Sequence, residues 1–214
     1  MIKGVIFDMD GVLIDSEVVY RNHMYEFLIR KKIEVELSEL NFLAGSCDRV
    51  ESEYIAKKLN TSIQEANEMK KAYYKEITVD YPKLKKPYVN ELLDYLMSEN
   101  IKIGLASSSK MENINRVLEE CKIKQYFTSI VSGEMFVETK PNPEIYHYSV
   151  RAINLNKEDI LVVEDSNYGV QAGKAAGLKV AAVLDSVFKF DVEAADYKIK
   201  SLQEVVEIIE SQKG

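Results

Sequence analysis

Length, composition and charge already exclude several classes of protein. The 214 residues are 46% hydrophobic and 29% charged, which is typical of a soluble globular chain with one domain plus an insertion, or with two small domains. A net charge of -7 argues against a nucleic-acid partner, which would favour a basic face, and the sequence has no apolar run of about 18 residues that could span a membrane. Cys47 and Cys121 stand far apart and no signal peptide precedes them, so we expect reduced thiols, a cytoplasmic location and a monomer.

The first third of the chain predicts one strand followed by helices. Residues 4–7 are apolar and rich in strand formers, which indicates a buried strand. Asp15 or Ser16 can cap a long helix after it, and apolar residues at helical spacing predict further helices over 38–43, 50–59 and 62–81. Two prolines, Pro82 and Pro87, then bracket a lysine-rich linker. We therefore expect residues 16–82 to form an all-helical insertion.

Strands and helices alternate after the linker. We expect strands over 101–106, 129–132, 160–163 and 179–184, and helices over 89–98, 113–120, 143–153, 168–176 and 202–209. Strands that are apolar throughout and separated by helices indicate a parallel sheet covered on both faces. The predicted fold class is α/β, with a doubly wound, Rossmann-like core built from residues 1–15 and 83–214.

Polar side chains follow these predicted strands where each one ends. The first strand ends at Asp8 and Asp10, the second at Ser107, and a later one at the pair Glu164-Asp165, while Lys140 stands in a loop before Pro141. The carboxyl ends of parallel strands share one edge of a sheet, so these groups can converge there. Acidic residues from two strands suit Mg²⁺, and a hydroxyl, loop N–H groups and a lysine suit an anion beside it. A cation next to an anion pocket and a carboxylate nucleophile indicates phosphoryl transfer.

Each of these residues also has an ordinary structural interpretation. Asp-Gly is a common turn pair, Ser107 can cap a helix, Glu164-Asp165 can cap the next helix, and a single lysine is usually solvated. Their joint occurrence after apolar strands favours the functional interpretation. We expect the two histidines, His23 and His147, to be surface or helix residues and not metal ligands, because the sequence has no Cys/His zinc spacing.

The chain resembles the haloacid dehalogenase superfamily along almost its whole length. Four motifs match in order: Asp8-Met9-Asp10-Gly11-Val12, Ser107, Lys140 in Lys140-Pro141-Asn142-Pro143-Glu144, and Glu164-Asp165. The predicted insertion is similar to the helical cap of the subgroup that contains β-phosphoglucomutase and many small-molecule phosphatases.

The resemblance implies a role for each of these residues. Asp8 is the expected nucleophile, which forms an aspartyl-phosphate, and Asp10 is the expected general acid and then base. Mg²⁺ is expected on side-chain oxygens of Asp8 and Asp165 and on the main-chain carbonyl of Asp10, with Glu164 as an outer or water-mediated partner. The residues expected to bind the substrate phosphate are Gly11, Ser107, Ser108 and Lys140.

Substrate choice is expected to reside in the cap. Tyr20 and Arg49 are our candidates for specificity, with Lys75 as a further polar position and Gly45 as a point where a loop could approach the cleft. A solvated helix face remains the simpler explanation of the polar residues. In β-phosphoglucomutases a histidine follows the first motif; at that spacing this chain has Tyr20, and His23 comes almost a turn later.

Three functions remain open at this stage. The favoured one is a Mg²⁺-dependent phosphatase of a small phosphate monoester, such as a sugar or polyol phosphate. The second is a phosphomutase of the β-phosphoglucomutase type. The third is a non-catalytic, receiver-like phosphoacceptor, which would need neither the helical insertion nor Asp10 as an acid.

Overall fold

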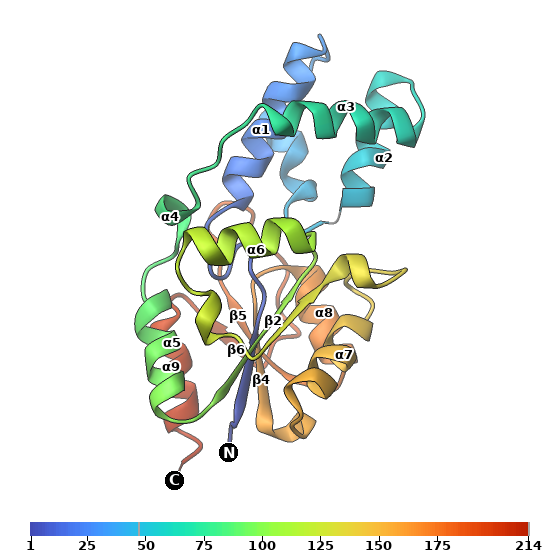
Figure 1. Ribbon diagram of the computed structural model, residues 1–214. Coiled ribbons are helices and arrows are strands. Elements are labelled where there is room, and N and C mark those ends of the chain that lie inside the picture. Colours follow the sequence, from blue (N-terminus) through green and yellow to red (C-terminus); the bar gives the residue numbers. More distant parts are fainter. Residues whose placement is uncertain (47, 214) are drawn as a thin grey trace.

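A computed structural model describes residues 1–46 and 48–213, so the prediction for Cys47 lies outside the described residues. Figure 1 shows an α/β body with a group of helices standing above it. The body contains six strands, β1 (Gly4–Phe7), β2 (Lys102–Ser107), β3 (Ser129–Ser132), β4 (Ile160–Glu164), β5 (Lys179–Val183) and β6 (Tyr197–Ile199). Cys121 is a buried free thiol that packs in the core.

The six strands form one parallel sheet in the order β3-β2-β1-β4-β5-β6, which confirms the predicted α/β class. The first strand lies in the middle, and chain order reverses on its two sides. Ligand sites in such sheets lie at this reversal, beyond the carboxyl ends of the strands. In the register, Phe7 pairs with Leu105 and with Val163, so β1, β2 and β4 end at neighbouring positions.

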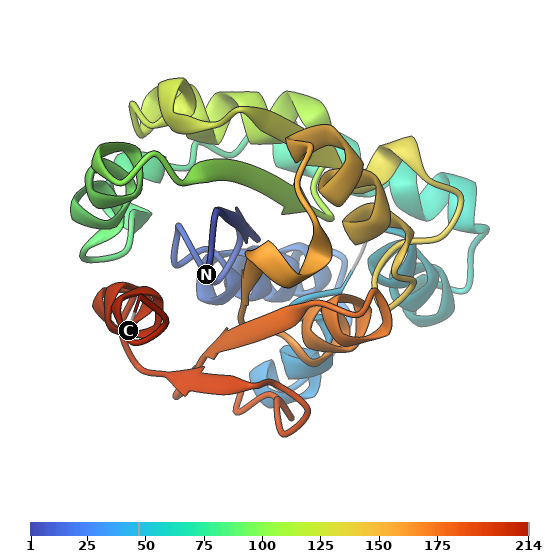
Figure 2. The same cartoon turned by 90° about the horizontal axis from the view of Figure 1, so that it is seen from below.

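Helices cover both faces of the sheet. On one face α5 (Val89–Ser98), α6 (Met111–Glu120) and α9 (Gln203–Glu210) pack on side chains such as Phe7 and Leu105. On the other face α7 (Glu144–Ile153) and α8 (Asn167–Ala175) pack on Ile6 and Val162. Figure 2 shows α5 and α9 on the opposite side of the sheet from α7 and α8. Alternate residues of β1, β2, β4 and β5 thus enter different cores, and this explains why these strands are apolar over most of their length. Short 3₁₀ turns η2 (Lys124–Tyr126), η3 (Gly133–Met135) and η4 (Lys157–Asp159) complete the body.

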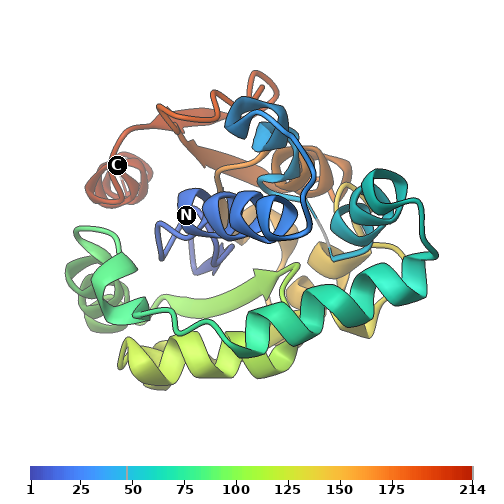
Figure 3. The same ribbon diagram turned by 90° about the horizontal axis from the view of Figure 1, so that it is seen from above.

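The helices above the sheet, which we call the inserted helices, are α1 (Glu17–Arg30), the 3₁₀ helix η1 (Leu37–Leu43), α2 (Asp48–Leu59) and α3 (Ile63–Lys75). They share a separate apolar core that includes Phe27, Leu40, Ile55 and Tyr73. From above, α1 crosses the carboxyl edge of the sheet, with α2 and α3 to one side (Figure 3). The chain therefore builds two apolar clusters on the sheet and a third over the predicted site.

Two segments connect the inserted helices to the body, and they run side by side. The main-chain N–H of Asp15 donates to the carbonyl of Leu84 at 2.7 Å, and that of Lys86 donates to the carbonyl of Leu13 at 2.9 Å. The predicted linker is partly helical, because α4 (Tyr81–Leu84) forms a single turn within it. Hydrogen bonds thus join the segment that leaves the body to the segment that returns to it from the inserted helices.

Two predictions about the elements are wrong. The helix expected to run to Tyr81 ends at Lys75, because the β-branched residues that follow, from Ile77 to Val79, disfavour helix and Pro82 restricts the residue before it. The strand β6 was not predicted, because it has three residues, lies at the sheet edge and places the exposed Lys198 at its centre. Within the described ranges, none of the helices combines the length and apolarity needed to cross a bilayer.

Candidate active site

The ends of β1, β2 and β4 open into a cavity of about 350 Å³ between the body and the inserted helices. Asp8 follows β1, Ser107 ends β2, and Asp165 follows β4; all three line this cavity together with Asp10 and Lys140. The topology therefore brings to one place the residues that the sequence separates by more than 150 positions.

Lys140 lies at the centre of a buried charge network. Its ammonium group donates to Asp8 Oδ1 at 2.6 Å, to Glu164 Oε1 at 2.6 Å and to the carbonyl of Ala106 at 2.9 Å. The Lys140 side chain is 4% exposed, so it is not the solvated lysine of the ordinary interpretation. Although burial opposes its charge, Asp8 and Glu164 raise the pKa of Lys140 above its ordinary value, and the amine stays cationic.

A third carboxylate, that of Asp165, joins the two that contact this lysine. Asp8, Glu164 and Asp165 are buried, and each offers an oxygen within 4.8 Å of the oxygens offered by the other two. Burial raises the pKa of Asp8 to about 7 despite the ion pair with Lys140, and burial beside Glu164 raises the pKa of Asp165 well above its ordinary value. Three buried carboxylates against one ammonium leave an excess of negative charge, which a divalent cation with oxygen ligands would satisfy. The residues present therefore fit a metal of the Mg²⁺ type.

Asp10 is not part of that acidic cluster; two serines hold its side chain. Ser16 donates its hydroxyl to Asp10 Oδ1 at 2.6 Å, and Ser109 donates to Oδ2 at 2.8 Å. Burial raises the pKa of Asp10, while these two hydrogen bonds and one from Tyr20 lower it. The sequence did not single out Ser109, although it stands in the serine run that follows β2. The carboxyl of Asp10 thus has a fixed orientation beside Asp8.

Two of the predicted phosphate-binding residues, Gly11 and Ser107, also have a structural role. A Cβ at Gly11 would lie 1.8 Å from Asp165 Oδ2, and the residue has φ +75°, so only glycine fits there. Ser107 is buried, and its hydroxyl accepts the N–H of Ser109 at 3.1 Å within the turn after β2; it does not cap α6, whose N-cap residue is Lys110. Ser107 and Ser108 both line the cavity, whereas Gly11 supports its wall.

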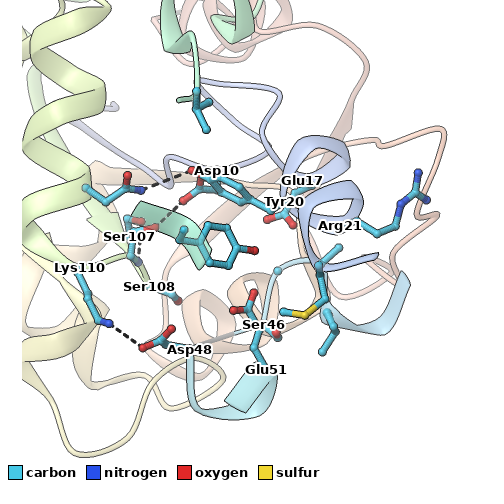
Figure 4. Close-up of a pocket in the computed structure, with 18 of the residues that line it drawn as sticks. Asp10, Glu17, Tyr20, Arg21, Ser46, Asp48, Glu51, Ser107, Ser108 and Lys110 are labelled. Carbon is cyan, nitrogen blue, oxygen red and sulfur yellow. Dashed lines mark hydrogen bonds and ion pairs between the residues drawn. The ribbon is translucent and has the colours of Figure 1, made fainter. Parts of the chain in front are cut away.

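The inserted helices contribute polar side chains to the side of the cavity that faces the sheet. Tyr20, one of the two specificity candidates, lines it together with Glu17 (Figure 4). Burial and the nearby Asp10 carboxylate raise the pKa of Glu17 well above its ordinary value. Gly45 lines the cavity too, and a Cβ there would lie 2.7 Å from Ser166 Cβ at the start of α8.

The other specificity candidates lie elsewhere. Arg49 is 78% exposed at its side chain and pairs with Glu53 at 2.8 Å along α2, and Lys75 is exposed at the end of α3; neither lines the cavity. Two residues further along, on the opposite face of the same helix, Glu51 points into the cavity where Arg49 was expected.

An ion-pair chain on the cavity wall joins the body to the inserted helices. Lys110, just before α6, pairs with Asp48 Oδ2 at 2.7 Å, as the dashed line in Figure 4 shows. The opposite oxygen of Asp48 pairs with the buried Lys70 of α3, which also pairs with Glu51 at 2.8 Å. Asp48 has two cationic partners, and their hydrogen bonds lower its pKa despite the burial that opposes them. The sequence gave no indication of this series of ion pairs, because its residues resemble ordinary charged residues on helix surfaces.

Comparison with known proteins agrees with this geometry. Residues 5–183 match the family model described as haloacid dehalogenase-like hydrolase. The chain therefore belongs to the haloacid dehalogenase-like hydrolases, as the four motifs indicated.

The relatives within that family include both a phosphatase and phosphomutases. The chain is 30% identical to a phosphorylated carbohydrates phosphatase of Thermotoga maritima, over 83% of this chain and 82% of the relative. It is 31% identical to a β-phosphoglucomutase of Bacillus subtilis, over 85% and 83% of the two chains. The crystal structure of a β-phosphoglucomutase from Clostridium difficile superposes with a TM-score of 0.80 at 28% identity, covering 99% of this chain and 97% of the other.

Proposed function

We propose that the protein is a Mg²⁺-dependent phosphatase that hydrolyses a small phosphate monoester, such as a sugar or polyol phosphate, through an aspartyl-phosphate on Asp8. The observation that carries this proposal is the network of Lys140 with Asp8 and Glu164 beside Asp165, at the floor of the cavity between the body and the inserted helices. A carboxylate nucleophile, a fixed cation and an oxygen cage are the parts that phosphoryl transfer needs.

In the first half of the reaction, an oxygen of Asp8 attacks phosphorus and the bond from phosphorus to the substrate oxygen breaks. The leaving alkoxide takes the proton of Asp10, whose raised pKa favours the protonated form that this step needs. Ser16 and Ser109 keep that carboxyl in one orientation, so the proton is directed at one place. Lys140 offsets charge on the phosphoryl oxygens while they pass to Asp8.

In the second half, Asp10 is ionised and acts as the base. It takes a proton from water, whose oxygen attacks phosphorus as the bond to Asp8 breaks, and inorganic phosphate and the starting enzyme result. Ser107, Ser108 and main-chain N–H groups near Gly11 are the proposed contacts to the phosphoryl oxygens.

The proposed metal site uses side-chain oxygens of Asp8 and Asp165 and the main-chain carbonyl of Asp10, with Glu164 as an outer partner. When bound, the cation would neutralise charge between the nucleophile and the phosphoryl group. Glu164 is suited to the outer position because Lys140 and Tyr146 already donate to its Oε1.

We further propose that residues 16–82 form a mobile cap on a core of residues 1–15 and 83–214, and that the enzyme works as a monomer in the cytoplasm. The separate apolar core of the inserted helices and the paired segments at Leu13–Asp15 and Leu84–Lys86 support the division. Closure of such a cap would exclude bulk water until the phosphoryl group has moved. Tyr20 is the proposed specificity residue that the cavity contains, and Arg49 would reach a substrate only through movement of the cap.

The test is a panel of small phosphomonoesters assayed with and without Mg²⁺, with the Asp8→Asn protein as the control. We expect Mg²⁺-dependent phosphate release by the parent and none by Asp8→Asn, which keeps the size of the side chain. Equal turnover by the two proteins would remove Asp8 from the mechanism.

The same panel decides between hydrolysis and isomerisation. Glucose 1-phosphate supplied with a hexose bisphosphate primer gives free phosphate if the protein is a phosphatase. It gives isomerised hexose phosphate with little free phosphate if the protein is a mutase, the alternative that similarity to β-phosphoglucomutases favours.

A further inference from the structure

Tyr146 is a wholly buried side chain that the proposed reaction does not use. It lies on α7, behind the charge network, and none of its surface is exposed. Its hydroxyl donates to Glu164 Oε1 at 2.5 Å, and the centre of its ring lies 5.1 Å from Lys140 Nζ. One oxygen of Glu164 therefore accepts hydrogen bonds from both the tyrosine and the lysine.

Lys140 has no N–H left for a substrate in this arrangement. Its three donors are used by Asp8, Glu164 and the carbonyl of Ala106. A phosphoryl group that reaches Lys140 must therefore take a share of one of these bonds. Asp8 lines the cavity and Glu164 is buried behind it, so the bond to Asp8 is the one that a ligand can reach. The position of the ammonium group then depends on Ala106 and Glu164.

Glu164 is itself held on several sides. Tyr146 fills one side of its carboxylate, and the N–H of Asp165 donates to Oε2 at 3.2 Å. On α8, Gly169 packs so closely that a Cβ there would lie 2.0 Å from either carboxylate oxygen. Burial beside the Glu164 carboxylate raises the pKa of Tyr146 well above its ordinary value, so its hydroxyl remains a donor.

We propose that Tyr146 is a positioning residue, which acts through Glu164 to keep the ammonium group of Lys140 in place when phosphate takes over its bond to Asp8. This inference rests on the proposed function, since it assumes that phosphate binds beside Asp8. Loss of the hydroxyl leaves Glu164 with one donor fewer, and the carboxylate then draws Lys140 toward itself and away from the cavity. The tyrosine contacts neither phosphate nor metal in this scheme.

The test compares Tyr146→Phe with Tyr148→Phe by calorimetric titration with inorganic phosphate in the presence of Mg²⁺. Both changes remove one hydroxyl from the same helix, but Tyr148 is 38% exposed and packs on Phe136. We expect Tyr146→Phe to weaken phosphate binding about tenfold, as loss of one hydrogen bond to a charged group implies, and kcat/KM to fall by a similar factor. Tyr148→Phe should stay within about twofold of the parent in this titration, because it removes no bond to a charged group.

A double-mutant cycle separates this role from simple packing. In a Glu164→Gln background the acceptor is neutral, so Tyr146→Phe should cost much less than in the parent, whereas a packing effect would cost the same in both. Equal losses in the two backgrounds, or phosphate affinity of Tyr146→Phe within twofold of the parent, would overturn the inference. If Glu164→Gln does not fold, the comparison of the two tyrosine variants decides alone. Failure of the parent protein to bind phosphate at all would overturn the proposed function, and this inference with it.

Discussion

Gly169→Ala should damage the site without any change to its polar residues. The glycine lies in the first turn of α8 with Glu164 directly beneath it. A Cβ at this position would lie 1.9 Å from Glu164 Cδ, well inside any van der Waals contact. Alanine is the better helix former by about 1 kcal/mol, so helix propensity alone predicts a gain in stability. The observed effect will therefore report the collision with Glu164.

The expected loss of stability follows from the hydrogen bonds that the Glu164 carboxylate must lose. Its carboxylate has to move, and it then loses the bonds from Lys140 at 2.6 Å and from Tyr146 at 2.5 Å. Breaking a buried ion pair costs about 3–5 kcal/mol, and the helix gain returns about 1, so the free energy of unfolding should fall by about 2–4 kcal/mol. Because Lys140 also loses its anchor, we expect kcat/KM for phosphate release to fall by at least about a hundredfold, the equivalent of about 2.7 kcal/mol.

Gly173→Ala in the same helix is the matched control. A Cβ there would lie 2.8 Å from Val180 Cγ2 in the apolar core, and 3.9 Å from Cε2 of Tyr146, which is ordinary van der Waals contact with the ring and leaves Glu164 untouched. It should cost about 1–3 kcal/mol of unfolding free energy through overpacking, and leave kcat/KM near that of the parent. Urea unfolding and phosphate release, measured on both variants, give the two quantities. Full activity in Gly169→Ala, or an equal loss of activity in Gly173→Ala, would refute the reasoning.

Three other changes test separate parts of the site. Lys110→Gln removes the ion pair with Asp48 that joins the body to the inserted helices. Both partners are about half exposed, so KM should rise no more than about fivefold. High salt should raise KM in the parent but not in the variant. Ser109→Ala removes a hydrogen bond that lowers the pKa of Asp10, so the alkaline limb of the pH profile of kcat/KM, where Asp10 loses the proton that it donates, should move to higher pH; an unmoved limb would exclude the serine. In the metal-free protein burial raises the pKa of Asp8 to about 7 and that of Asp165 well above its ordinary value, so protons compete with the cation as the pH falls. Calorimetry should show Mg²⁺ affinity falling below pH 7 by up to about tenfold per pH unit for each aspartate that must lose a proton, and an affinity independent of pH would contradict the assignment.

Much of the body was predictable because each of its signals is local. A short apolar run that is rich in strand formers and bounded by turn residues indicates a buried strand, and parallel pairing then brings the ends of the strands to one edge. This reasoning placed Asp8, Ser107 and Asp165 around one cavity before any contact was known. It missed β6, because three edge residues around Lys198 give no apolar run.

The contacts that orient the site were not predictable in the same way. The bond of Ser109 to Asp10 spans 99 positions, and that of Tyr146 to Glu164 spans 18, from α7 to the end of the strand that follows it. A hydroxyl on a helix or a loop reads the same in a sequence whether it faces solvent or a carboxylate. Arg49 illustrates the opposite error, since its charge suggested an anion contact but the winding of α2 turns Glu51 to the cavity in its place.

The balance of charge explains why the network has this composition. Asp8, Glu164 and Asp165 supply three negative charges and Lys140 supplies one positive charge, which leaves two uncompensated charges in a buried site. In the absence of a cation the site can reduce that cost only by binding protons, and the raised pKa values of the two aspartates express that tendency. A divalent cation would cancel the excess without a proton and leave Asp8 ionised, as its proposed role of nucleophile requires. With Lys140 present, the excess negative charge of the site equals the charge of one divalent cation. We propose that Tyr146 and Gly169 keep Lys140 in the position where it contributes to this balance.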